Sequence, residues 1–342
     1  MALEFRKEIR TCSFLDPTNN FAEKSLPIEF RYDPLTMDMG ILVSFRTNQP
    51  EKQDLSQLIA KSLEKGCPFC PGSVEKVTPR FIPAICPEGR IKVGDATVFP
   101  NAVPYMPYSA VTVLSAEHFV GLTEFTPKML TDAFLASLSY FEKVRQYDPG
   151  VQYCCIIWNY MPPAQSSQLH PHHHVLPSHS PLAYYQKLLE ASQKYRDESG
   201  ANYWRDFVAE EKRLQERYIT TVGNTVWLTS FVPRSAFFDV MAIFQSNDTI
   251  VSLSSDDIGA FSRGLTAVFK YMADENFYSF NLCLYSGIVK GDIFWTQAKV
   301  VPRATLSPLG ISDVGNLTLL GDTSLVLRFP ELVCQELKPY FG

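Results

Sequence analysis

The sequence predicts an α+β protein in which two fused units each consist of an antiparallel sheet with helices packed on it. Short apolar segments typical of strands flank longer segments of helical character, and the second half of the chain repeats this order. A chain of 342 residues also holds enough apolar material for two such units. We expect the first unit over residues 1–182, a helical connector over 183–220 and the second unit over 221–342.

In the first half, a turn at Asp33-Pro34 precedes a short apolar strand over residues 41–45. A polar segment with a helical period then leads to the turn at Gly66. Thr126 as N-cap and Pro127 at the first helical position predict a helix of about five turns that ends near residue 146. Strands are expected from residue 98 and over 111–114, 153–159 and 169–176, the last two antiparallel across the loop 161–168.

In the second half, residues 184–218 are charged and helical with a break near Gly200, which is typical of a connector between two units. The segments that follow repeat the order of two strands, a helix and two strands. They are 226–232, 237–244, 256–272, 278–285 and 294–301. We interpret this repetition as an internal duplication.

Composition and charge exclude several classes of protein. Hydrophobic residues make up 46% of the chain, charged residues 20%, and the net charge is −5, which argues against a basic surface that binds nucleic acid. The N-terminus lacks the apolar core of a signal peptide, and no segment approaches the roughly 18 apolar residues of a membrane span. We therefore expect a cytoplasmic enzyme with no membrane partner. The eight cysteines are irregularly spaced and indicate thiols or metal ligands rather than a disulfide framework.

Histidine is concentrated in one short segment. The chain has six histidines, and five of them lie between His170 and His179. A strand through this segment would place His170, His172 and His174 on one face, because side chains alternate with period two. A purely structural role is hard to satisfy for three neighbouring imidazoles, each of which needs a hydrogen-bond partner or a metal. A metal site and a catalytic site are the alternatives.

A metal site can be assembled from four residues that lie apart in the sequence. Cys67 and Cys70 have the C-x-x-C spacing that lets two thiolates hold one ion, although a redox pair or a plain turn has the same spacing. Together with His118 and His170 they form a Cys2His2 set, the ligands of a structural zinc site. We expect one structural zinc ion per chain.

These motifs resemble, in order, those of the galactose-1-phosphate uridylyltransferase family, the transferase branch of the histidine-triad superfamily. The resemblance implies two histidine-triad-like units, the second of them degenerate. The motifs are Arg31-Tyr32-Asp33-Pro34-Leu35-Thr36, Val43-Ser44-Phe45-Arg46 with Pro50, Cys67-Pro68-Phe69-Cys70-Pro71-Gly72, Phe99-Pro100-Asn101, Ser115-Ala116-Glu117-His118 and His170-Pro171-His172.

The resemblance implies a role for each candidate site residue. His172 is the nucleophile, and Asn159 and Ser167 precede His170 at the family's spacing for groups that contact phosphate. His174 is a further donor to the phosphate. For substrate binding, the resemblance implies Arg46 near a phosphate, Asn101 near the ribose or phosphate and Phe99 at the base.

The sequence also departs from the family. His174 stands where the transferases usually carry glutamine, and Gln49 replaces an expected arginine. Gln297 and Lys299 stand where histidines of a second metal site would be expected, so we expect no such site. The stretch 313–316 lacks the aromatic residue and glutamate that would meet a hexose phosphate.

These features favour a transferase with two half-reactions. A neutral imidazole can attack phosphorus without repulsion between anions, provided its other ring nitrogen donates a proton to a fixed acceptor, which we expect to be a carbonyl of the neighbouring strand. The expected partners are a nucleotide sugar and a phosphorylated small-molecule acceptor. The alternatives are a hydrolase, because H-x-H-x-H also occurs in the superfamily's hydrolases, a nucleotide-sugar phosphorylase, and a catalytically idle zinc-stabilised binding protein. The oligomeric state stays open, a homodimer included.

Overall fold

The computed structural model describes residues 3–43, 50–287, 292–306 and 310–342. Within these residues, ten strands form one sheet in the order β4-β5-β6-β8-β7-β12-β13-β11-β10-β9. All of its neighbouring strands are antiparallel. The α+β class expected from the sequence is confirmed.

The chain builds this sheet in two halves with the same order of elements. The first half consists of β4 (Ile91–Val93), β5 (Ala96–Pro100), β6 (Ala110–Val113), α3 (Pro127–Tyr147), β7 (Tyr153–Tyr160) and β8 (His172–Ser178). The second half consists of β9 (Tyr218–Val222), β10 (Thr225–Thr229), β11 (Val240–Phe244), α6 (Ser255–Asp274), β12 (Ser279–Gly287) and β13 (Gln297–Arg303). The halves meet where β7 pairs with β12, with Ile157 opposite Cys283 near the centre. The order and pairing of elements therefore repeat about an approximate two-fold axis.

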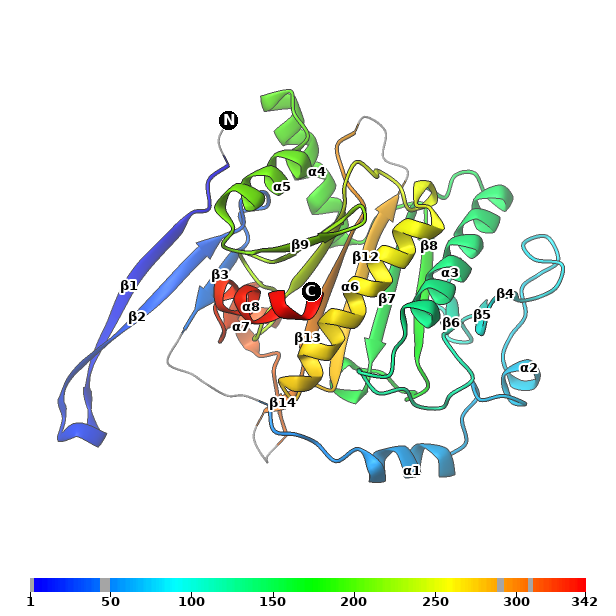
Figure 1. The fold of residues 1–342 in the computed structure, drawn as a ribbon, viewed down its shortest axis with the longest axis horizontal. Coiled ribbons are helices and arrows are strands. Elements are labelled where there is room, and N and C mark those ends of the chain that lie inside the picture. The colour runs from blue at the N-terminus through cyan, green and yellow to red at the C-terminus, as the bar shows by residue number, and fades with distance from the viewer. Residues whose placement is uncertain (1–2, 44–49, 288–291, 307–309) are drawn as a thin grey trace.

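Helices α3 and α6 lie side by side over one face of this sheet (Figure 1). Thr126 caps α3 by accepting a hydrogen bond from the Met129 amide, and Ser254 and Asp257 form a capping box at the start of α6. The two helices contact each other through Phe134 and Phe261, whose ring centroids are 5.2 Å apart. The main hydrophobic core fills the space between these helices and the sheet.

The opposite face of the sheet is covered differently in the two halves. Over the second half, α4 (Ala183–Ser199) and α5 (Tyr203–Leu214) form a smaller core with β10, β11 and β12. Gly200 ends α4 in the left-handed conformation, and the Asn202 side chain caps α5. Over the first half, this face carries the cavity described below.

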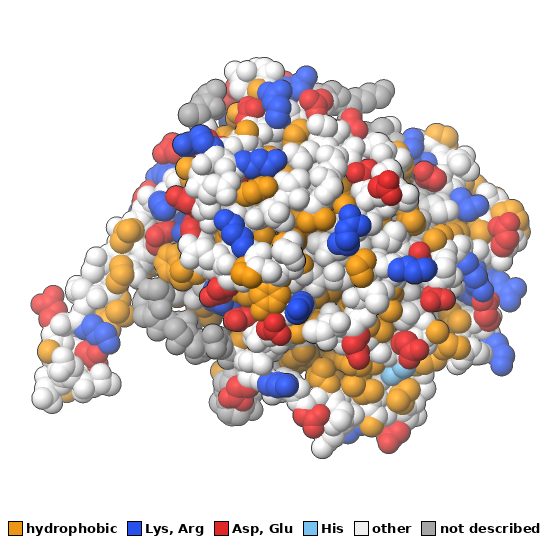
Figure 2. All heavy atoms as spheres, viewed as in Figure 1, with side chains coloured by type: hydrophobic (Ala, Val, Ile, Leu, Met, Phe, Trp, Pro, Cys, Tyr) orange, Lys and Arg blue, Asp and Glu red, His pale blue; other side chains and the backbone are white. Residues whose placement is uncertain are grey.

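A second sheet, of order β1-β2-β3-β16, lies beside the first. Strands β1 (Lys7–Asp16) and β2 (Ala22–Tyr32) form a hairpin that projects far from the body of the molecule (Figure 1). Hydrophobic side chains lie among charged ones on its surface (Figure 2), and they include the exposed Ile9, Leu15 and Phe21. The sheet is completed by β3 (Met39–Leu42) and by β16 (Ser324–Val326), which is parallel to β3.

The remaining elements are short. They are α1 (Ser56–Glu64), α2 (Val74–Val77), α7 (Asn316–Leu319), α8 (Pro330–Leu337), β14 (Thr305–Leu306), β15 (Ile311–Ser312) and the 3-10 turns Pro17–Asn19, Pro162–Ala164, Ile250–Ser252 and Lys338–Phe341. Among the helices of the described residues, none combines the length and apolar character that a membrane crossing requires.

Several predicted boundaries differ from the structure. The strand expected over 41–45 covers Met39–Leu42, and residues 44 and 45 lie outside the described residues. The strand expected from residue 169 begins at His172, because Pro171 has no amide hydrogen to donate to the ladder. His170 therefore lies before the strand that carries His172 and His174.

Candidate active site and metal centre

A cavity of about 420 Å³ lies on the sheet face opposite α3, beside the start of β8. Strand β8 contributes His172 and His174, and the neighbouring β7 contributes Asn159. The other walls come from the loop between β7 and β8, the segment around α2, strands β5 and β6 and the loop between these two strands. The lining residues of these walls are Pro68, Phe69, Val77, Thr78, Pro79, Phe99, Asn101, Ala102, Val103, Tyr105, Val111, Gln165, Ser166, Ser167 and Gln168.

His172 is held in one orientation by a backbone carbonyl. Its Nδ1 lies 2.8 Å from the carbonyl oxygen of His170, so Nδ1 carries the proton and donates it, and Nε2 keeps a lone pair. Burial lowers the pKa of His172 to about 4. The acceptor therefore lies two residues before His172 in the same segment, and our expectation of a carbonyl on the neighbouring strand was wrong. The chain bends at His170, just before β8 begins, and its carbonyl reaches the ring from there.

His174 lies two residues further along the same face. The centroids of the His172 and His174 rings are 5.4 Å apart, and Tyr105 lies 5.2 Å from the His174 ring on the other side. His174 Nδ1 is buried without a hydrogen-bond partner among the described residues. Burial lowers the pKa of this imidazole to about 4. His174 thus has ring nitrogens free to hold or exchange a proton.

His173 lies on the opposite face, within the core under α3. Its Nε2 is 2.7 Å from the Ser137 hydroxyl, and its ring stacks on Phe134 with centroids 5.2 Å apart. The period of two in β8 therefore separates a structural histidine from the two that line the cavity.

Aromatic side chains form the apolar wall of the cavity. The Phe69 and Phe99 rings are 5.7 Å apart, and Phe69 also meets the His172 ring edge to face at 5.1 Å. The Arg90 guanidinium lies behind Phe99, 5.4 Å from its ring centre. Asn101 accepts a hydrogen bond from the Val103 amide and so shapes the loop after β5. This wall suits a flat, apolar group such as a nucleic acid base.

The loop between β7 and β8 brings polar groups to the other side of the cavity. Met161 and Gln165 have positive φ angles of 69° and 67°, a conformation that costs roughly 1–3 kcal/mol per residue and is commonest at functional sites. After Gln165, the Ser166 hydroxyl donates to the Gln168 carbonyl at 2.7 Å, and Ser167 is exposed at the cavity.

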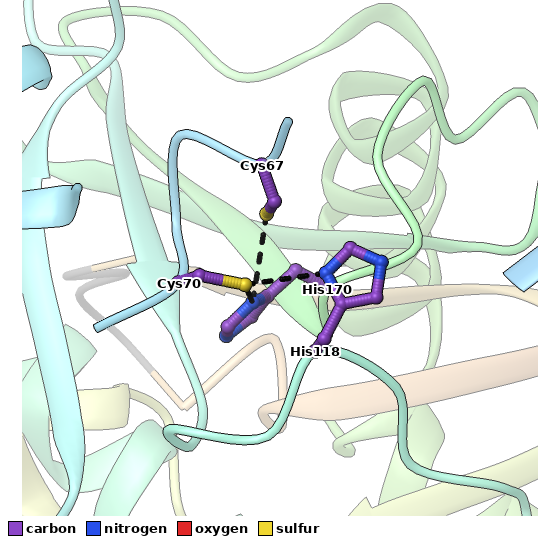
Figure 3. Close-up of side chains that lie close together, drawn as sticks. All are labelled: Cys67, Cys70, His118 and His170. Carbon is purple, nitrogen blue, oxygen red and sulfur yellow. Dashed lines mark hydrogen bonds between the residues drawn. The ribbon is translucent and has the colours of Figure 1, made fainter. Parts of the chain in front are cut away.

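Four side chains near the cavity form a group that could hold a metal ion. The ligand atoms of Cys67, Cys70, His118 and His170 all lie within 4.8 Å of one another (Figure 3). Nδ1 of His170 is 3.7 Å from the sulfur of each cysteine, and Nδ1 of His118 is 3.3 Å from the Cys70 sulfur. Burial and the neighbouring Cys67 raise the pKa of Cys70 to about 11, so a pair of thiolates here requires a cation.

Both histidines of this group use their second nitrogen for support. His170 Nε2 donates to the Ser115 carbonyl at 2.8 Å, and His118 Nε2 lies 2.6 Å from the Ser62 hydroxyl. Such outer contacts fix the ring and leave Nδ1 for the metal. Because the His170 carbonyl also accepts the hydrogen bond from His172 Nδ1, this one residue joins the metal group to the candidate nucleophile.

The structure brings most of the residues expected from the sequence to two adjacent places. Asn159, Ser167, His172, His174, Asn101 and Phe99 line the cavity, and the four expected metal ligands form the metal group. Arg46 lies outside the described residues. Phe69 and Tyr105 also line the cavity and were not expected from the sequence. The position of Phe69 within the C-P-F-C motif could have indicated it. The Pro-rich loop that carries Tyr105 contains no such signal.

The second half of the sheet has counterparts of the two cavity histidines. In the first half, His172 and His174 pair with Val113 and Val111 of β6. In the second half, the corresponding pairs with β11 are Gln297–Ile243 and Lys299–Met241. There the face is filled by Tyr203, Trp204 and Phe207 of α5, and both amide atoms of Gln297 are buried without a partner among the described residues.

Three solved structures share the fold of this chain over most of their length. An ADP-glucose phosphorylase from Arabidopsis thaliana with bound ADP-glucose has a TM-score of 0.70, with 17% identity over 91% of this chain and 98% of its own. A GALT-like protein from Arabidopsis thaliana has a TM-score of 0.69, with 17% identity over 90% and 98% of the two chains. A uridylyltransferase has a TM-score of 0.66, with 17% identity over 91% and 98%. The chain shares the fold of these GALT-like and uridylyltransferase structures.

At the sequence level, no family model matches the chain. An uncharacterised protein of Archaeoglobus fulgidus is 30% identical over 337 residues, which is 98% of each chain. The chain belongs to the same family as this archaeal protein.

Proposed function

We propose that this chain is a nucleotidyltransferase in which His172 carries a nucleoside monophosphate from a nucleotide sugar to a sugar 1-phosphate or inorganic phosphate. The observation that carries the proposal is the bond from His172 Nδ1 to the His170 carbonyl, which reserves Nε2 of a cavity-lining ring as the nucleophile. The fold shared with a uridylyltransferase and with an ADP-glucose phosphorylase supports this chemistry.

The reaction takes place in two balanced steps. In the first, the Nε2 lone pair attacks the α-phosphorus, a P–N bond forms, and the bond from that phosphorus to the bridging oxygen breaks, so that sugar 1-phosphate leaves with the electron pair. In the second, an oxygen of the acceptor phosphate attacks the same phosphorus and the P–N bond breaks, which restores the imidazole. Throughout both steps, the His170 carbonyl holds the proton on Nδ1.

Donors around His172 stabilise the charge on the non-bridging oxygens. Asn159, Ser167 and His174 are the proposed donors, since they line the same cavity. Phe69 and Phe99 would enclose the base, with Asn101 at the ribose or phosphate. A role for Arg46 at a substrate phosphate remains a prediction.

The metal group fits one zinc ion. A tetrahedral zinc with Zn–S near 2.3 Å and Zn–N near 2.0 Å places sulfur and nitrogen roughly 3.5 Å apart. The three S–N distances of 3.3 to 3.7 Å agree with this value. Zinc would stabilise the fold here and keep His170, and with it the acceptor of His172 Nδ1, in place.

Two observations keep water and inorganic phosphate open as acceptors. His174 lies beside His172 and has a ring that can exchange protons, as a hydrolase requires. Asp313 forms a bidentate ion pair with Arg303. It begins the stretch 313–316, which would lie near a hexose acceptor. This second contact favours a phosphorylase over a transferase that uses a hexose phosphate.

The proposal is tested by mixing the enzyme with UDP-, ADP- and GDP-sugars and measuring its intact mass. We expect one donor to add the mass of one nucleoside monophosphate less water, and the adduct to disappear on addition of phosphate or a sugar 1-phosphate. Turnover of a donor without any adduct under rapid quench at acidic and at alkaline pH would contradict a covalent intermediate.

A further inference from the structure

Three polar side chains of the second half lie on the sheet face that carries His172. Asn281 of β12 is directly opposite Asn159 of β7 in the ladder. Arg303 ends β13, two residues beyond Val301, the ladder partner of Asn281. Asp313 follows β15, and its carboxylate is 3% exposed. These residues connect the cavity to the far half of the molecule.

These three side chains and Asn159 form one continuous chain of hydrogen bonds. Asp313 accepts from Arg303 Nε at 2.9 Å and from Nη2 at 2.8 Å. Arg303 Nη1 donates to Asn281 Oδ1 at 2.7 Å. Asn281 Nδ2 donates to Asn159 Oδ1 at 2.7 Å.

The direction of every bond in this chain follows from Arg303. A guanidinium has only donors, so the atom of Asn281 that faces Arg303 must be its oxygen. The Asn281 atom that faces Asn159 is then the NH2 group, and it requires an oxygen as its partner. The Asn159 amide is thereby fixed with Oδ1 toward Asn281, and no described residue accepts a hydrogen bond from its Nδ2.

Asn281 also holds the loop that carries Ser167. Its Nδ2 donates a second bond, of 3.1 Å, to the carbonyl of Ala164. That carbonyl lies in the 3-10 turn between Met161 and Gln165, the two residues with positive φ. One side chain therefore contacts both polar elements of the cavity wall.

We propose that Asn281, oriented by Arg303, is a positioning residue that turns the NH2 group of Asn159 toward the substrate phosphate. The inference rests on the proposed function, in which Asn159 donates to a phosphoryl oxygen. The amide could present either its oxygen or its NH2 group to the cavity, and only the NH2 group stabilises negative charge. The Arg303–Asp313 pair decides between them.

The test compares two variants of nearly the same size. In Asn281→Asp, the carboxylate has only acceptors, so Asn159 must rotate and present its oxygen to the phosphate. In Asn281→Leu, no bond is made, and the Asn159 amide can still rotate to the favourable orientation. Both variants lose the bond to Ala164, and the repulsion between the carboxylate of Asn281→Asp and the Ala164 carbonyl is covered by the Asn159→Ala control below. We expect kcat to fall about 100-fold in Asn281→Asp and only about tenfold in Asn281→Leu. Changes in KM should be smaller.

A purely structural role predicts the opposite order, because Asn281→Leu removes the acceptor of Arg303 Nη1, whereas Asn281→Asp keeps an acceptor there. Unfolding midpoints and zinc content, measured alongside, show that both variants are folded. Equal kcat values in the two variants, or a lower value in Asn281→Leu, would overturn the inference.

The added negative charge of Asn281→Asp is controlled by repeating the comparison in the Asn159→Ala background. If amide orientation is the cause, the two variants should differ by less than about threefold there, because no amide remains to be turned. A difference that persists undiminished would assign the effect to charge and refute the role of Asn281. Absence of a nucleotide adduct in the wild-type enzyme would instead contradict the proposed function itself.

Discussion

His172 and His173 are neighbours in sequence and lie on opposite faces of β8, so they form a matched pair for mutation. His172→Ala should lower kcat by about 1,000-fold or more, because it removes the nucleophile. His173→Ala should instead lower the free energy of unfolding by about 1–3 kcal/mol, since it leaves a hole beside Phe134 and removes the bond to Ser137.

Activity per folded molecule and denaturant unfolding, measured on both variants, check this prediction. Zinc content should be unchanged in each. Activity of His172→Ala within tenfold of the wild type would refute His172 as the nucleophile.

His174 is the residue at which transfer and hydrolysis can be separated. A glutamine amide could still hold a phosphoryl oxygen, but it cannot exchange protons with water or a leaving group near neutral pH. We expect His174→Gln to reduce the release of free nucleoside monophosphate by about tenfold or more and to affect transfer to a phosphorylated acceptor less.

The partition of a labelled donor between nucleotide product and free monophosphate, at saturating acceptor, measures this effect. In the wild-type enzyme, transfer should exceed release of the monophosphate. If free monophosphate dominates with every acceptor, inorganic phosphate included, the enzyme is a hydrolase.

At the scale of elements, the start of β8 is fixed by the metal group. His170 contacts both cysteines through Nδ1 and the Ser115 carbonyl through Nε2, and so holds the chain just before the strand. Cys67→Ser should therefore cost on the order of several kcal/mol of stability and lower solubility, with activity lost as a consequence.

Cys12→Ser is the matched control, because Cys12 is exposed on β1, apart from the metal group, and its loss should leave the unfolding midpoint unchanged. Metal analysis should find about one zinc per chain in the wild type. Freshly purified protein without zinc, with Cys67 and Cys70 in a disulfide, would disprove the assignment.

Elements with strong local signals could be predicted from the sequence. The helix after Thr126 has its cap and proline where expected, and the break at Gly200 separates α4 from α5. The hairpin of β1 and β2 was not predicted, because its ten ladder pairs mix polar and apolar residues on both faces and give no clean alternation. Strands β4, β9 and β16 are only three to five residues long, so their alternation of apolar and polar residues is too short to predict a strand.

In the candidate site, too, some residues could be predicted from local sequence patterns and others could not. His172, His174 and the metal ligands could be found because histidine and cysteine are rare and their spacing is distinctive. Asn281 and Arg303 could not be found, since their relation to Asn159 depends on the pairing of β7 with β12 and of β12 with β13. A residue whose partner lies more than a hundred positions away leaves no local pattern.

At the scale of the whole molecule, the candidate site lies in one half of the duplicated sheet. Gln297 and Lys299 occupy the positions of His172 and His174, and α5 fills the face where the cavity would lie. Helices α4 and α5 lie in the connector expected over residues 183–220, and both helices also bury aromatic side chains against the second half. Nucleotide labelling should therefore saturate at one per chain.

The boundaries predicted at residues 182 and 220 separate units that share a sheet. Strands β7 and β12 pair over eight residues, and α3 contacts α6 through buried phenylalanines. A fragment that ends before β12 would expose the edge of β7 that pairs with β12, together with the apolar face of α3 that packs on α6. We expect residues 1–200 and residues 201–342 each to aggregate when expressed alone.

A cut in the intact chain should have the opposite result. Gly200 is exposed and lies between α4 and α5, whose buried side chains would hold the two pieces together. In the test, a protease site is inserted at Gly200 and then cleaved. The cleaved protein should elute as one species and keep kcat within about twofold of the uncleaved insertion variant. The reason is that the cut breaks neither the ladder between β7 and β12 nor the bond between Asn281 and Asn159. Residues 1–200 that are soluble, folded and active without their partner would show instead that the first half is an independent domain, and that the second half contributes nothing to the position of Asn159.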